Sequence, residues 1–230
     1  MSPPDSRRAG AGSTSHGAFV VDTAFVHRWI MNAAARVEEQ RDFLTQLDAA
    51  IGDADHGINI HRGFVASVAT MQTSDERSAG ALLTEVGTTL VYRVGGAAGP
   101  LYGAGFRNIG SVLSEAKIPD AEALLAALRA GLQGIQDLGA AVPGDKTMVD
   151  AWAPAVAAFE QELRVGGATV DAARRASDAA AEGVAATLRM QARKGRASYL
   201  GPRSIGHQDP GATSTALLFA ALERAVRGSA

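Results

Sequence analysis

Apolar residues recur at intervals of three and four positions along most of the chain, which is the period of an amphipathic helix. No segment alternates apolar and polar residues over the length of a strand, so the pattern predicts helices alone. Glycine, proline and short polar stretches interrupt the periodic segments and mark the connections. The predicted fold class is all-α, with eight helices over residues 22–50, 60–71, 82–90, 101–114, 119–135, 149–163, 169–193 and 212–226.

The connections between these helices alternate in character along the chain. Those that follow the first, third, fifth and seventh predicted helices carry glycines or polar side chains suited to chemistry. In an antiparallel up-and-down array, every second connection lies at the same end. The sequence therefore predicts that four connections meet at one rim, namely residues 51–59, 95–100, 139–147 and 194–211.

Length and composition place the chain among globular proteins with one core. The 230 residues and 47% hydrophobic content suit a single domain, predicted over residues 21–230. Residues 1–20 are rich in proline, serine, glycine and arginine, so a disordered tail is predicted there. The tail lacks the apolar segment of a secretory signal, and no run of ~18 apolar residues follows it. A cytoplasmic protein without a membrane span is therefore expected.

Charge and cysteine content narrow the chemistry. The formal net charge is −2 and no long block of one sign occurs, which argues against nucleic acid or a membrane surface as the main partner. The absence of cysteine excludes disulfides, thiolate nucleophiles and thiolate zinc sites. Catalysis is therefore expected to rest on carboxylates, histidine, lysine, arginine or a metal ion.

The densest candidate site follows the first predicted helix. Asp48 lies near the C-terminal end of that helix, where the helix dipole is negative, and Asp53 and Asp55 follow in the turn. Like charges this close repel one another or recruit a cation. Because a divalent ion with oxygen ligands is the simplest compensation, the three carboxylates are candidate metal ligands.

A helix cap, an EF-hand and an aspartyl nucleophile are the alternatives to a metal cluster of this kind. Any single aspartate in a turn is commonly a helix N-cap or a loop residue. An EF-hand is excluded, because a loop that starts at Asp53 places Ile58 where glycine is required and Phe64 where the bidentate glutamate belongs. An aspartyl nucleophile of the phosphatase type would follow a buried strand, whereas an amphipathic helix precedes this turn.

Two further connections are rich in glycine. The stretch GGAAGP at 95–100 exposes backbone N–H groups at the start of a helix and can cradle phosphate, although a flexible connector has the same composition. The stretch GAAVPGDKT at 139–147 approaches the Walker pattern, but Asp145 intervenes and a helix precedes it, so a P-loop is rejected. Lys146 is predicted to be solvated or to pair with an acidic neighbour.

The fourth connection, residues 194–211, is long and dense in functional side chains, including two arginines that can neutralise phosphate. Asp209 is a candidate N-cap with Pro210 at the first helical position, which leaves the N–H groups of Gly211 and Ala212 facing the rim. Carboxylates, glycine loops, a helix N-terminus and arginine at one rim together fit a metal-bound nucleotide.

Four motifs, in this order, resemble the nucleotide-binding L subunit of dihydroxyacetone kinases. The resemblance runs from about residue 25 to the C-terminus and is specific, because the motifs are separated in the chain. They are DAAIGDADHGIN at 48–59, GGAAGPLYG at 95–103, GDKTM at 144–148, and GRASYLG at 195–201 followed by GHQDPGAT at 206–213.

The resemblance implies an eight-helix antiparallel barrel with the nucleotide at one rim. It implies two Mg²⁺ ions on the phosphates, held by Asp48, Asp53 and Asp55, which together with His56 are the expected catalytic residues. It also implies which residues contact ADP or ATP, namely His56, Gly57, Asn59, Gly96, Ala97, Ala98, Gly139, Thr147, Met148, Arg196, Asp209, Pro210 and Gly211.

In this family the acceptor is a ketose held on a separate K subunit, and the L subunit supplies the phosphoryl group. In the phosphotransferase-linked type, bound ADP is rephosphorylated by a third subunit that carries a phosphohistidine. The chain resembles a free-standing L module, which favours this type. The alternatives are an ATP-dependent kinase subunit for dihydroxyacetone or a related ketose such as erythrulose, and a nucleotide-loaded regulatory adaptor. The sequence leaves open whether two copies form a homodimer.

Two residues depart from the family pattern. Ala54 stands where glycine is usual between the last two aspartates, and it is expected to be tolerated unless that position requires a positive φ. Ala98 stands where serine is common in the second loop, so one hydroxyl–phosphate hydrogen bond of about 1 kcal/mol is expected to be lost.

Overall fold

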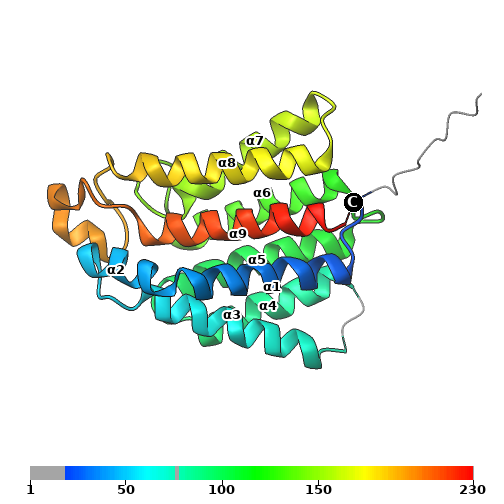
Figure 1. Ribbon diagram of the computed structural model, residues 1–230, viewed down its shortest axis with the longest axis horizontal. Coiled ribbons are helices and arrows are strands. Elements are labelled where there is room, and N and C mark those ends of the chain that lie inside the picture. The colour runs from blue at the N-terminus through cyan, green and yellow to red at the C-terminus, as the bar shows by residue number, and fades with distance from the viewer. Residues whose placement is uncertain (1–18, 76–77, 230) are drawn as a thin grey trace, which may run out of the picture.

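The computed structural model describes residues 19–75 and 78–229, and these residues fold into helices without any β-strand (Figure 1). The all-α prediction is therefore confirmed. The elements are α1 (Thr23–Glu39), α2 (Arg41–Ile51), α3 (His56–Thr73), α4 (Ala79–Arg93), α5 (Ala98–Glu115), α6 (Ala121–Gly139), α7 (Val149–Arg164), α8 (Thr169–Thr187), the 3₁₀ helix η1 (Arg196–Ser204) and α9 (Pro210–Arg227).

The long helices pack in a closed cyclic order that leaves α2 outside it. Each helix from α3 to α9 contacts the next long helix along the chain, α9 contacts α1, and α1 contacts α3. In Figure 1 these helices lie side by side along the long axis of the molecule, with α2 and η1 at one end. Within the described residues, eight helices thus make up the ring, and the connections before α3, α5, α7 and α9 come to the same end.

Aromatic side chains on neighbouring elements interlock inside the ring. The rings of Trp29 on α1 and Phe106 on α5 have their centroids 5.5 Å apart, and those of Trp152 on α7 and Phe219 on α9 are 5.4 Å apart. Each indole N–H donates to a backbone carbonyl of a neighbouring helix, so neither buried donor is left unpaired. Among these helices, α5, α7 and α9 begin at the rim, so the contacts help to fix the position of their first turns.

Glycines allow α4 and α5 to approach closely. A Cβ at Gly110 would lie 2.5 Å from the carbonyl oxygen of Gly80, and one at Gly103 would lie 2.8 Å from that of Gly87. Larger side chains at these positions would force the two helices apart, because both distances are shorter than carbon and oxygen tolerate. The close pairing holds the short connection between the two helices, residues 94–97, in its place at the rim.

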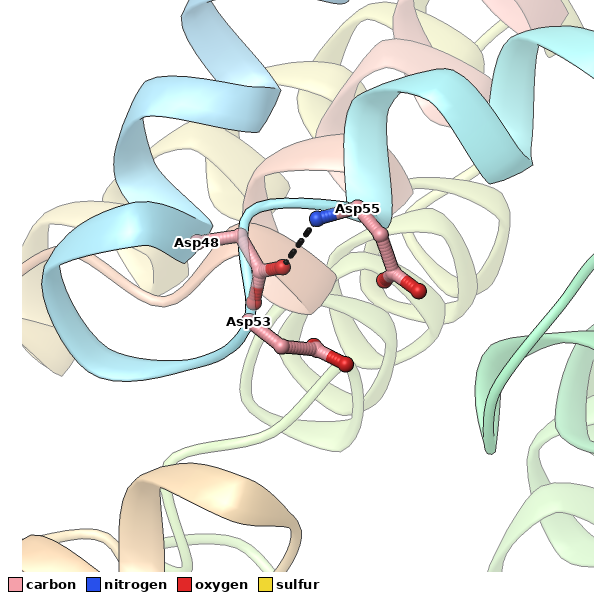
Figure 2. Close-up of side chains that lie close together, drawn as sticks. All are labelled: Asp48, Asp53 and Asp55. Carbon is pink, nitrogen blue, oxygen red and sulfur yellow. Dashed lines mark hydrogen bonds between the residues drawn. The ribbon is translucent and has the colours of Figure 1, made fainter.

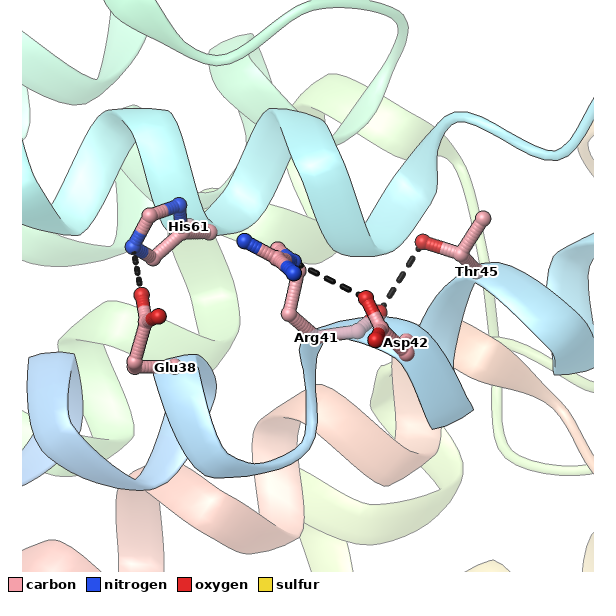
Figure 3. Close-up of polar contacts among 5 residues, drawn as sticks. All are labelled: Glu38, Arg41, Asp42, Thr45 and His61. Atoms are coloured by element: carbon pink, nitrogen blue, oxygen red, sulfur yellow. Dashed lines mark hydrogen bonds and ion pairs between the residues drawn. The ribbon is translucent and has the colours of Figure 1, made fainter.

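The first predicted helix is two helices in the structure. Gln40 leaves helical geometry, with φ −106° and ψ 7°, and α2 then packs mainly on α3 instead of continuing the ring. Figure 3 shows Glu38, near the end of α1, paired with His61 of α3, and within α2 the Thr45 hydroxyl donates to the carbonyl of Arg41 at 2.9 Å. Apolar spacing continues through Gln40, so periodicity alone could not reveal the break.

Several other predicted boundaries differ from the structure, and α3, α4 and α5 each begin three or four residues earlier than predicted. α8 ends at Thr187 instead of residue 193, and η1 occupies the middle of a connection that was predicted to be irregular. Of the predicted tail, residues 1–18 lie outside the described residues, whereas the ring of Phe19 packs edge-on against Phe25 at 5.5 Å. Among the described helices, none combines the length and apolarity that a membrane crossing requires.

Candidate functional site

Four connections line one cavity of about 490 Å³ at the end of the ring that carries α2 and η1. Of the residues predicted to bind metal or nucleotide, Gly57 does not line this cavity. It packs on α2 instead, where an added Cβ would meet the carbonyl of Arg41. The others all line the cavity: Asp48, Asp53, Asp55, His56, Asn59, Gly96, Ala97, Ala98, Gly139, Thr147, Met148, Arg196, Asp209, Pro210 and Gly211.

Asp48, Asp53 and Asp55 lie close together in and beside the turn between α2 and α3 (Figure 2). One carboxylate oxygen from each residue lies within 4.8 Å of one oxygen of each of the others. Asp48 is buried, with 8% of its surface exposed, whereas Asp53 is exposed and Asp55 partly exposed. Hard oxygen donors in such a group are the ligands that Mg²⁺ prefers.

The Asp48 carboxylate also starts the next helix. Its Oδ2 accepts the backbone N–H groups of Asp55 at 2.9 Å and His56 at 3.2 Å, at the N-terminus of α3. Asp55, the residue before α3, makes no side-chain cap of its own. The other oxygen, Oδ1, lies against Gly52, where an added Cβ would overlap it. The turn is therefore built around one carboxylate of the candidate metal cluster.

Ala54 adopts a backbone conformation that glycine adopts without strain. Its φ is +62°, in the left-handed region. For a residue with a Cβ, this conformation costs about 1–2 kcal/mol. The position between the last two aspartates therefore does have a positive φ. Alanine was expected to be tolerated there only without a positive φ, so Ala54 is a strained substitution.

Arg196 extends from η1 to the acidic turn. Its Nη2 lies 2.9 Å from Oδ2 of Asp53. Because 67% of the Arg196 side chain and 35% of the Asp53 side chain are exposed, solvent screens the pair, and it contributes no more than about 1 kcal/mol. The contact instead places a guanidinium group, which can bind phosphate oxygens in bidentate fashion, at the edge of the carboxylate cluster.

His56 is held by the start of α9. Its Nε2 lies 2.9 Å from Oγ of Ser214, and the ring also hydrogen-bonds the backbone of Pro210. Because a proline offers only a backbone carbonyl, the ring must donate the hydrogen bond there. Burial lowers the pKa of His56, against the opposing effect of Asp48 and Asp55. The neutral ring thus links the N-termini of α3 and α9.

A buried hydroxyl network continues from Ser214 into the core. The hydroxyl of Tyr102 lies 2.7 Å from Oγ of Ser214, 2.8 Å from Oγ1 of Thr215 and 3.2 Å from the carbonyl oxygen of Gly211. Burial raises the pKa of Tyr102, so the phenol stays protonated. No role was predicted for Tyr102, Ser214 or Thr215, although Tyr102 stands in the motif at 95–103, because no local pattern reports which distant hydroxyls meet.

Asn59 is oriented by an arginine that the sequence did not single out. Nη2 of Arg62 donates to Oδ1 of Asn59 at 2.8 Å, while Nε of Arg62 donates to the carbonyl of Arg93 at 2.7 Å. Gly95 lies against the amide, since an added Cβ would be 2.9 Å from both of its terminal atoms. Because the amide oxygen is engaged, the amide N–H groups are the part of Asn59 left for a ligand.

The connection before α5 presents backbone donors. Ala97 occupies the N-cap position of α5 and has no side chain that could cap the helix. Gly96 has φ +65°, and an added Cβ there would meet no atom within 4 Å, so its surroundings are open. An N-terminus without a side-chain cap, beside an open glycine, favours an anion such as phosphate.

Asp209 caps α9, as predicted. Its Oδ2 accepts the N–H of Ala212 at 2.6 Å, so that N–H does not face the rim, contrary to the prediction. Burial raises the pKa of Asp209 to about 7, and the negative charges of Asp150 and Asp48 act in the same direction. Of the two N–H groups predicted at the rim, the one at Gly211 remains beside the cavity.

Apolar side chains make up another part of the cavity wall, and the sequence analysis missed most of them. They belong to α5, α6, α7 and the connection before α7, where periodicity assigns them to the core. A wall with apolar and acidic parts suits a ligand that has a flat heterocycle at one end and phosphates at the other. The additional residues include Leu101, Ile135, Leu138, Ala141 and Val149.

Lys146 differs from both of its predicted environments. It is 1% exposed, so it is not solvated, and its Nζ donates to backbone carbonyls instead of pairing with a carboxylate. Burial lowers its pKa, and the charge of Asp209 opposes that shift. The lysine is therefore not placed as a Walker lysine, in agreement with the rejected P-loop.

The donor set fits a metal-bound nucleotide. Three carboxylates supply oxygen ligands, helix N-termini supply N–H groups for phosphate, and the apolar wall can take a heterocycle. The fold and the cavity therefore define an all-helical domain of the nucleotide-binding class.

Comparison with known proteins gives the family. The DAK2 domain matches residues 50–224. The ADP-binding subunit DhaL of PEP-dependent dihydroxyacetone kinase 1 from Listeria innocua is 41% identical over 201 residues, which cover 87% of this chain and 96% of that protein. The corresponding PEP-dependent subunit of Escherichia coli is 40% identical over 199 residues, covering 86% and 95%. The chain belongs to the DAK2 domain family.

Longer proteins and solved structures contain the same unit. L-erythrulose 1-kinase of Mycolicibacterium smegmatis is 40% identical over 185 residues, which are 78% of this chain and 31% of that protein. The dihydroxyacetone kinase of C. freundii superposes with a TM-score of 0.68 in its native form and 0.67 in complex with AMP-PNP and Mg²⁺. The identities are 22% and 23%, and the match covers 97% of this chain and 39% and 38% of those chains, which confirms the fold.

Proposed function

We propose that this chain is the ADP-binding subunit of a phosphotransferase-linked ketose kinase. It passes a phosphoryl group from a Mg²⁺-bound adenine nucleotide to a ketose held on a separate subunit. The observation that carries the proposal is the carboxylate cluster of Asp48, Asp53 and Asp55 in the wall of the cavity that four connections line. Relatives that cover nearly all of this chain are ADP-binding subunits of dihydroxyacetone kinases, so dihydroxyacetone is the first acceptor to test.

The three aspartates are proposed to hold two Mg²⁺ ions. When bound, the ions neutralise phosphate charge and position the phosphate oxygens, which is most of what phosphoryl transfer requires of a protein. Asp48 is preorganised for this role, because its hydrogen bonds to the start of α3 fix its carboxylate. Arg196, beside Asp53, adds a positive group at the outer edge of the cluster.

The remaining rim residues are proposed to bind the nucleotide itself. The N–H groups of Gly96, Ala97 and Ala98 and the start of α9 face phosphate oxygens, and the amide of Asn59 donates to them. Gly139, Thr147 and Met148, with the apolar side chains near them, form the pocket for the adenine ring. An apolar pocket for the base fits a nucleotide that stays bound between cycles.

The acceptor is proposed to lie on a partner. His56, the lining residue of the type that most often serves as a general base, has a lowered pKa and is engaged by Ser214 and Pro210. A ketose-binding K subunit that docks at the rim would then supply both the acceptor hydroxyl and the group that activates it.

The phosphoryl donor is proposed to be a phosphohistidine-carrying phosphotransferase subunit. A relative from Lactococcus lactis, 39% identical over 202 residues, is the ADP-binding subunit of a PTS-dependent dihydroxyacetone kinase. In such a cycle the phosphohistidine gives its phosphoryl group to resident ADP, and the resulting ATP gives the same group to the ketose. ADP is then left in the cavity for the next cycle.

A second candidate is an ATP-dependent subunit for a four-carbon ketose. The match to L-erythrulose 1-kinase, at 40% identity, is as close as the match to the E. coli subunit, although it covers 31% of that longer protein. Exchangeable ATP and resident ADP make different demands on the same cavity, so the donor experiment separates the two candidates.

The proposal is tested by reconstitution. The purified chain is mixed with a K subunit, a phosphotransferase subunit and dihydroxyacetone or erythrulose, with label supplied either through phosphoenolpyruvate or as ATP. Asp53→Ala is compared with Asp42→Ala, a control that removes an exposed carboxylate on α2. Loss of several kcal/mol of charge stabilisation predicts that Asp53→Ala lowers transfer at least about 100-fold.

Each outcome bears on a different part of the proposal. Label that reaches the ketose from phosphoenolpyruvate through substoichiometric ADP supports the phosphotransferase-linked kinase, whereas transfer from ATP alone supports the second candidate. Equal turnover of Asp53→Ala and Asp42→Ala would show that the aspartate cluster is not the metal site.

A further inference from the structure

Lys146 carries a buried positive charge that the proposed phosphoryl transfer does not use. Its Nζ lies 2.8 Å from the carbonyl oxygen of Thr187, 3.1 Å from that of Met190, 2.7 Å from that of Ser204 and 2.5 Å from that of His207. An ammonium group has three protons, so at least one proton is shared between two of the four oxygens, and together these oxygens form a cage around the charge.

The four carbonyls come from three segments that converge on the ammonium. Thr187 ends α8 and Met190 follows it, so these carbonyls lie at the negative end of the α8 dipole. Carbonyls at this end of a helix have no intrahelical N–H donor. Ser204 ends η1, and His207 precedes the cap of α9. Without a cation at their centre, four carbonyl dipoles would point at one another inside the protein.

The segment that the ammonium holds forms part of the cavity wall. Lys194, Gly195, Arg196 and Ala197 lie between the Met190 and Ser204 carbonyls in the chain, and Asp209 follows His207 closely; all five residues line the cavity. Any movement of the caged carbonyls would therefore displace the residues that face the ligand.

Lys146 itself is anchored for this role. It adopts φ +63°, an uncommon conformation for a residue with a Cβ, and its neighbours hold it there. The Asp150 carboxylate accepts the N–H groups of Gly144 at 2.5 Å and Thr147 at 2.8 Å. On the other side, the Asp145 carbonyl accepts the N–H of Arg193 at 3.0 Å, which ties the same turn to the segment after α8.

We propose that the Lys146 ammonium is a tethered monovalent cation, a positioning group that holds the segments around α8, η1 and α9 in register and so fixes one wall of the cavity. Rings of backbone carbonyls of this kind coordinate K⁺ where no lysine is present. Covalent attachment keeps the cation inside the cage, so the wall does not depend on the ionic composition of the surroundings.

The proposal predicts a cation dependence that the wild type lacks. In Lys146→Ala, the carbonyl cage is left with room for a small free cation, whereas in Lys146→Met an apolar chain fills the same space. Lys117→Ala is the matched control, because it removes an exposed lysine far along the chain from the cage. Each variant is tested at constant ionic strength in tetramethylammonium, which is too large for the cage, and then with methylammonium, NH₄⁺ or K⁺.

The first readout is thermal unfolding without nucleotide, so it does not rest on the proposed function. Loss of the ammonium should lower the unfolding temperature of Lys146→Ala in tetramethylammonium by more than about 5 °C, and methylammonium or NH₄⁺ should restore most of it by binding the folded state. Lys146→Met should stay destabilised in every salt, while the wild type and Lys117→Ala should not respond to the cation.

The second readout is calorimetric binding of Mg²⁺·ADP, which rests on the proposed function. Lys146→Ala should bind at least about tenfold more weakly in tetramethylammonium and recover with methylammonium. If the wild type does not bind ADP, the proposed function fails while the unfolding readout still decides the cation proposal. Unfolding of Lys146→Ala that is the same in all cations, including a failure to fold in any of them, would overturn the tethered-cation proposal.

Discussion

The carboxylate of Asp48 accepts the backbone N–H of Asp55 at 2.9 Å (Figure 2). One candidate metal ligand thus positions another, and the same carboxylate also accepts the N–H of His56 at the start of α3. The acidic turn is therefore not a loose group of charges. Its geometry is set by hydrogen bonds within the chain, and several predictions depend on that arrangement.

Replacement of Asp48 separates capping from metal binding. Asp48→Asn keeps a side-chain oxygen for the two N–H groups but loses the charge, so we expect near-normal stability and much weaker Mg²⁺ binding. Asp48→Ala loses both functions, and the missing cap should lower the free energy of unfolding by about 1–2 kcal/mol. Urea unfolding and Mg²⁺ titration measure the two effects, and equal stability of the two variants would contradict the capping role.

Gly52 is expected to be required for the position of the Asp48 carboxylate. A Cβ there would overlap Oδ1 of Asp48, so Gly52→Ala should displace the carboxylate and weaken Mg²⁺ binding at least about tenfold. Gly228→Ala is the control, because Gly228 also follows a helix but a Cβ there meets its nearest atom at an ordinary 3.4 Å. Normal Mg²⁺ affinity in Gly52→Ala would argue against the carboxylate cluster as the metal site.

Ala54→Gly is expected to relieve backbone strain. The left-handed conformation costs alanine about 1–2 kcal/mol in the folded state. Glycine opposes part of this gain, because its greater conformational entropy stabilises the unfolded chain by about 0.4–1 kcal/mol. The net change should raise the free energy of unfolding by up to about 1 kcal/mol, as measured by chemical denaturation. Destabilisation by this substitution would show that Ala54 makes contacts that outweigh its strained φ.

Ala98→Ser is expected to strengthen nucleotide binding, if the connection before α5 holds phosphate as proposed. Ala98 is the first residue of α5 and lines the cavity, so a hydroxyl there can donate to a phosphate oxygen. One such bond is worth about 1 kcal/mol, which corresponds to roughly fivefold higher ADP affinity by calorimetry. If Ala98→Ser binds both ADP and AMP with the same affinity as the wild type, the phosphates do not lie at the start of α5.

Asp209 is expected to make stability depend on pH. Its folded-state pKa of about 7 lies above the ordinary carboxyl value of 3.8, so the folded state favours the protonated carboxyl. The contribution of this group to the free energy of unfolding is therefore complete below about pH 4 and is lost as pH rises through 7. Asp209→Asn keeps an acceptor for the α9 cap but does not titrate. The stability of the wild type relative to this variant should fall by up to about 4 kcal/mol between pH 4 and pH 8.

Urea unfolding of both proteins at a series of pH values, without Mg²⁺ or nucleotide, measures this difference directly. Other titrating groups, His56 among them, are present in both proteins, so their contributions cancel in the comparison. Parallel stability curves for the wild type and Asp209→Asn would show that the buried carboxyl keeps an ordinary pKa.

The sequence by itself determined the helical class and the acidic turn. Both depend on local information, because the period of apolar residues reports helices and the spacing of Asp48, Asp53 and Asp55 lies within eight residues of chain. The alternation of connections was enough to bring four of them to one rim. The same local signals missed the break at Gln40, because apolar spacing continues across a change of helix direction.

Only the tertiary structure decided what the remaining polar groups do. The partner of the His56 ring is Ser214, 158 positions away, and the acceptors of Lys146 lie 41 to 61 positions away. The apolar half of the cavity likewise consists of helical stripes that the sequence assigns to the core. The physical reason is that such contacts depend on how helices pack, and no local pattern reports which distant carbonyl, hydroxyl or side chain will meet a buried polar group.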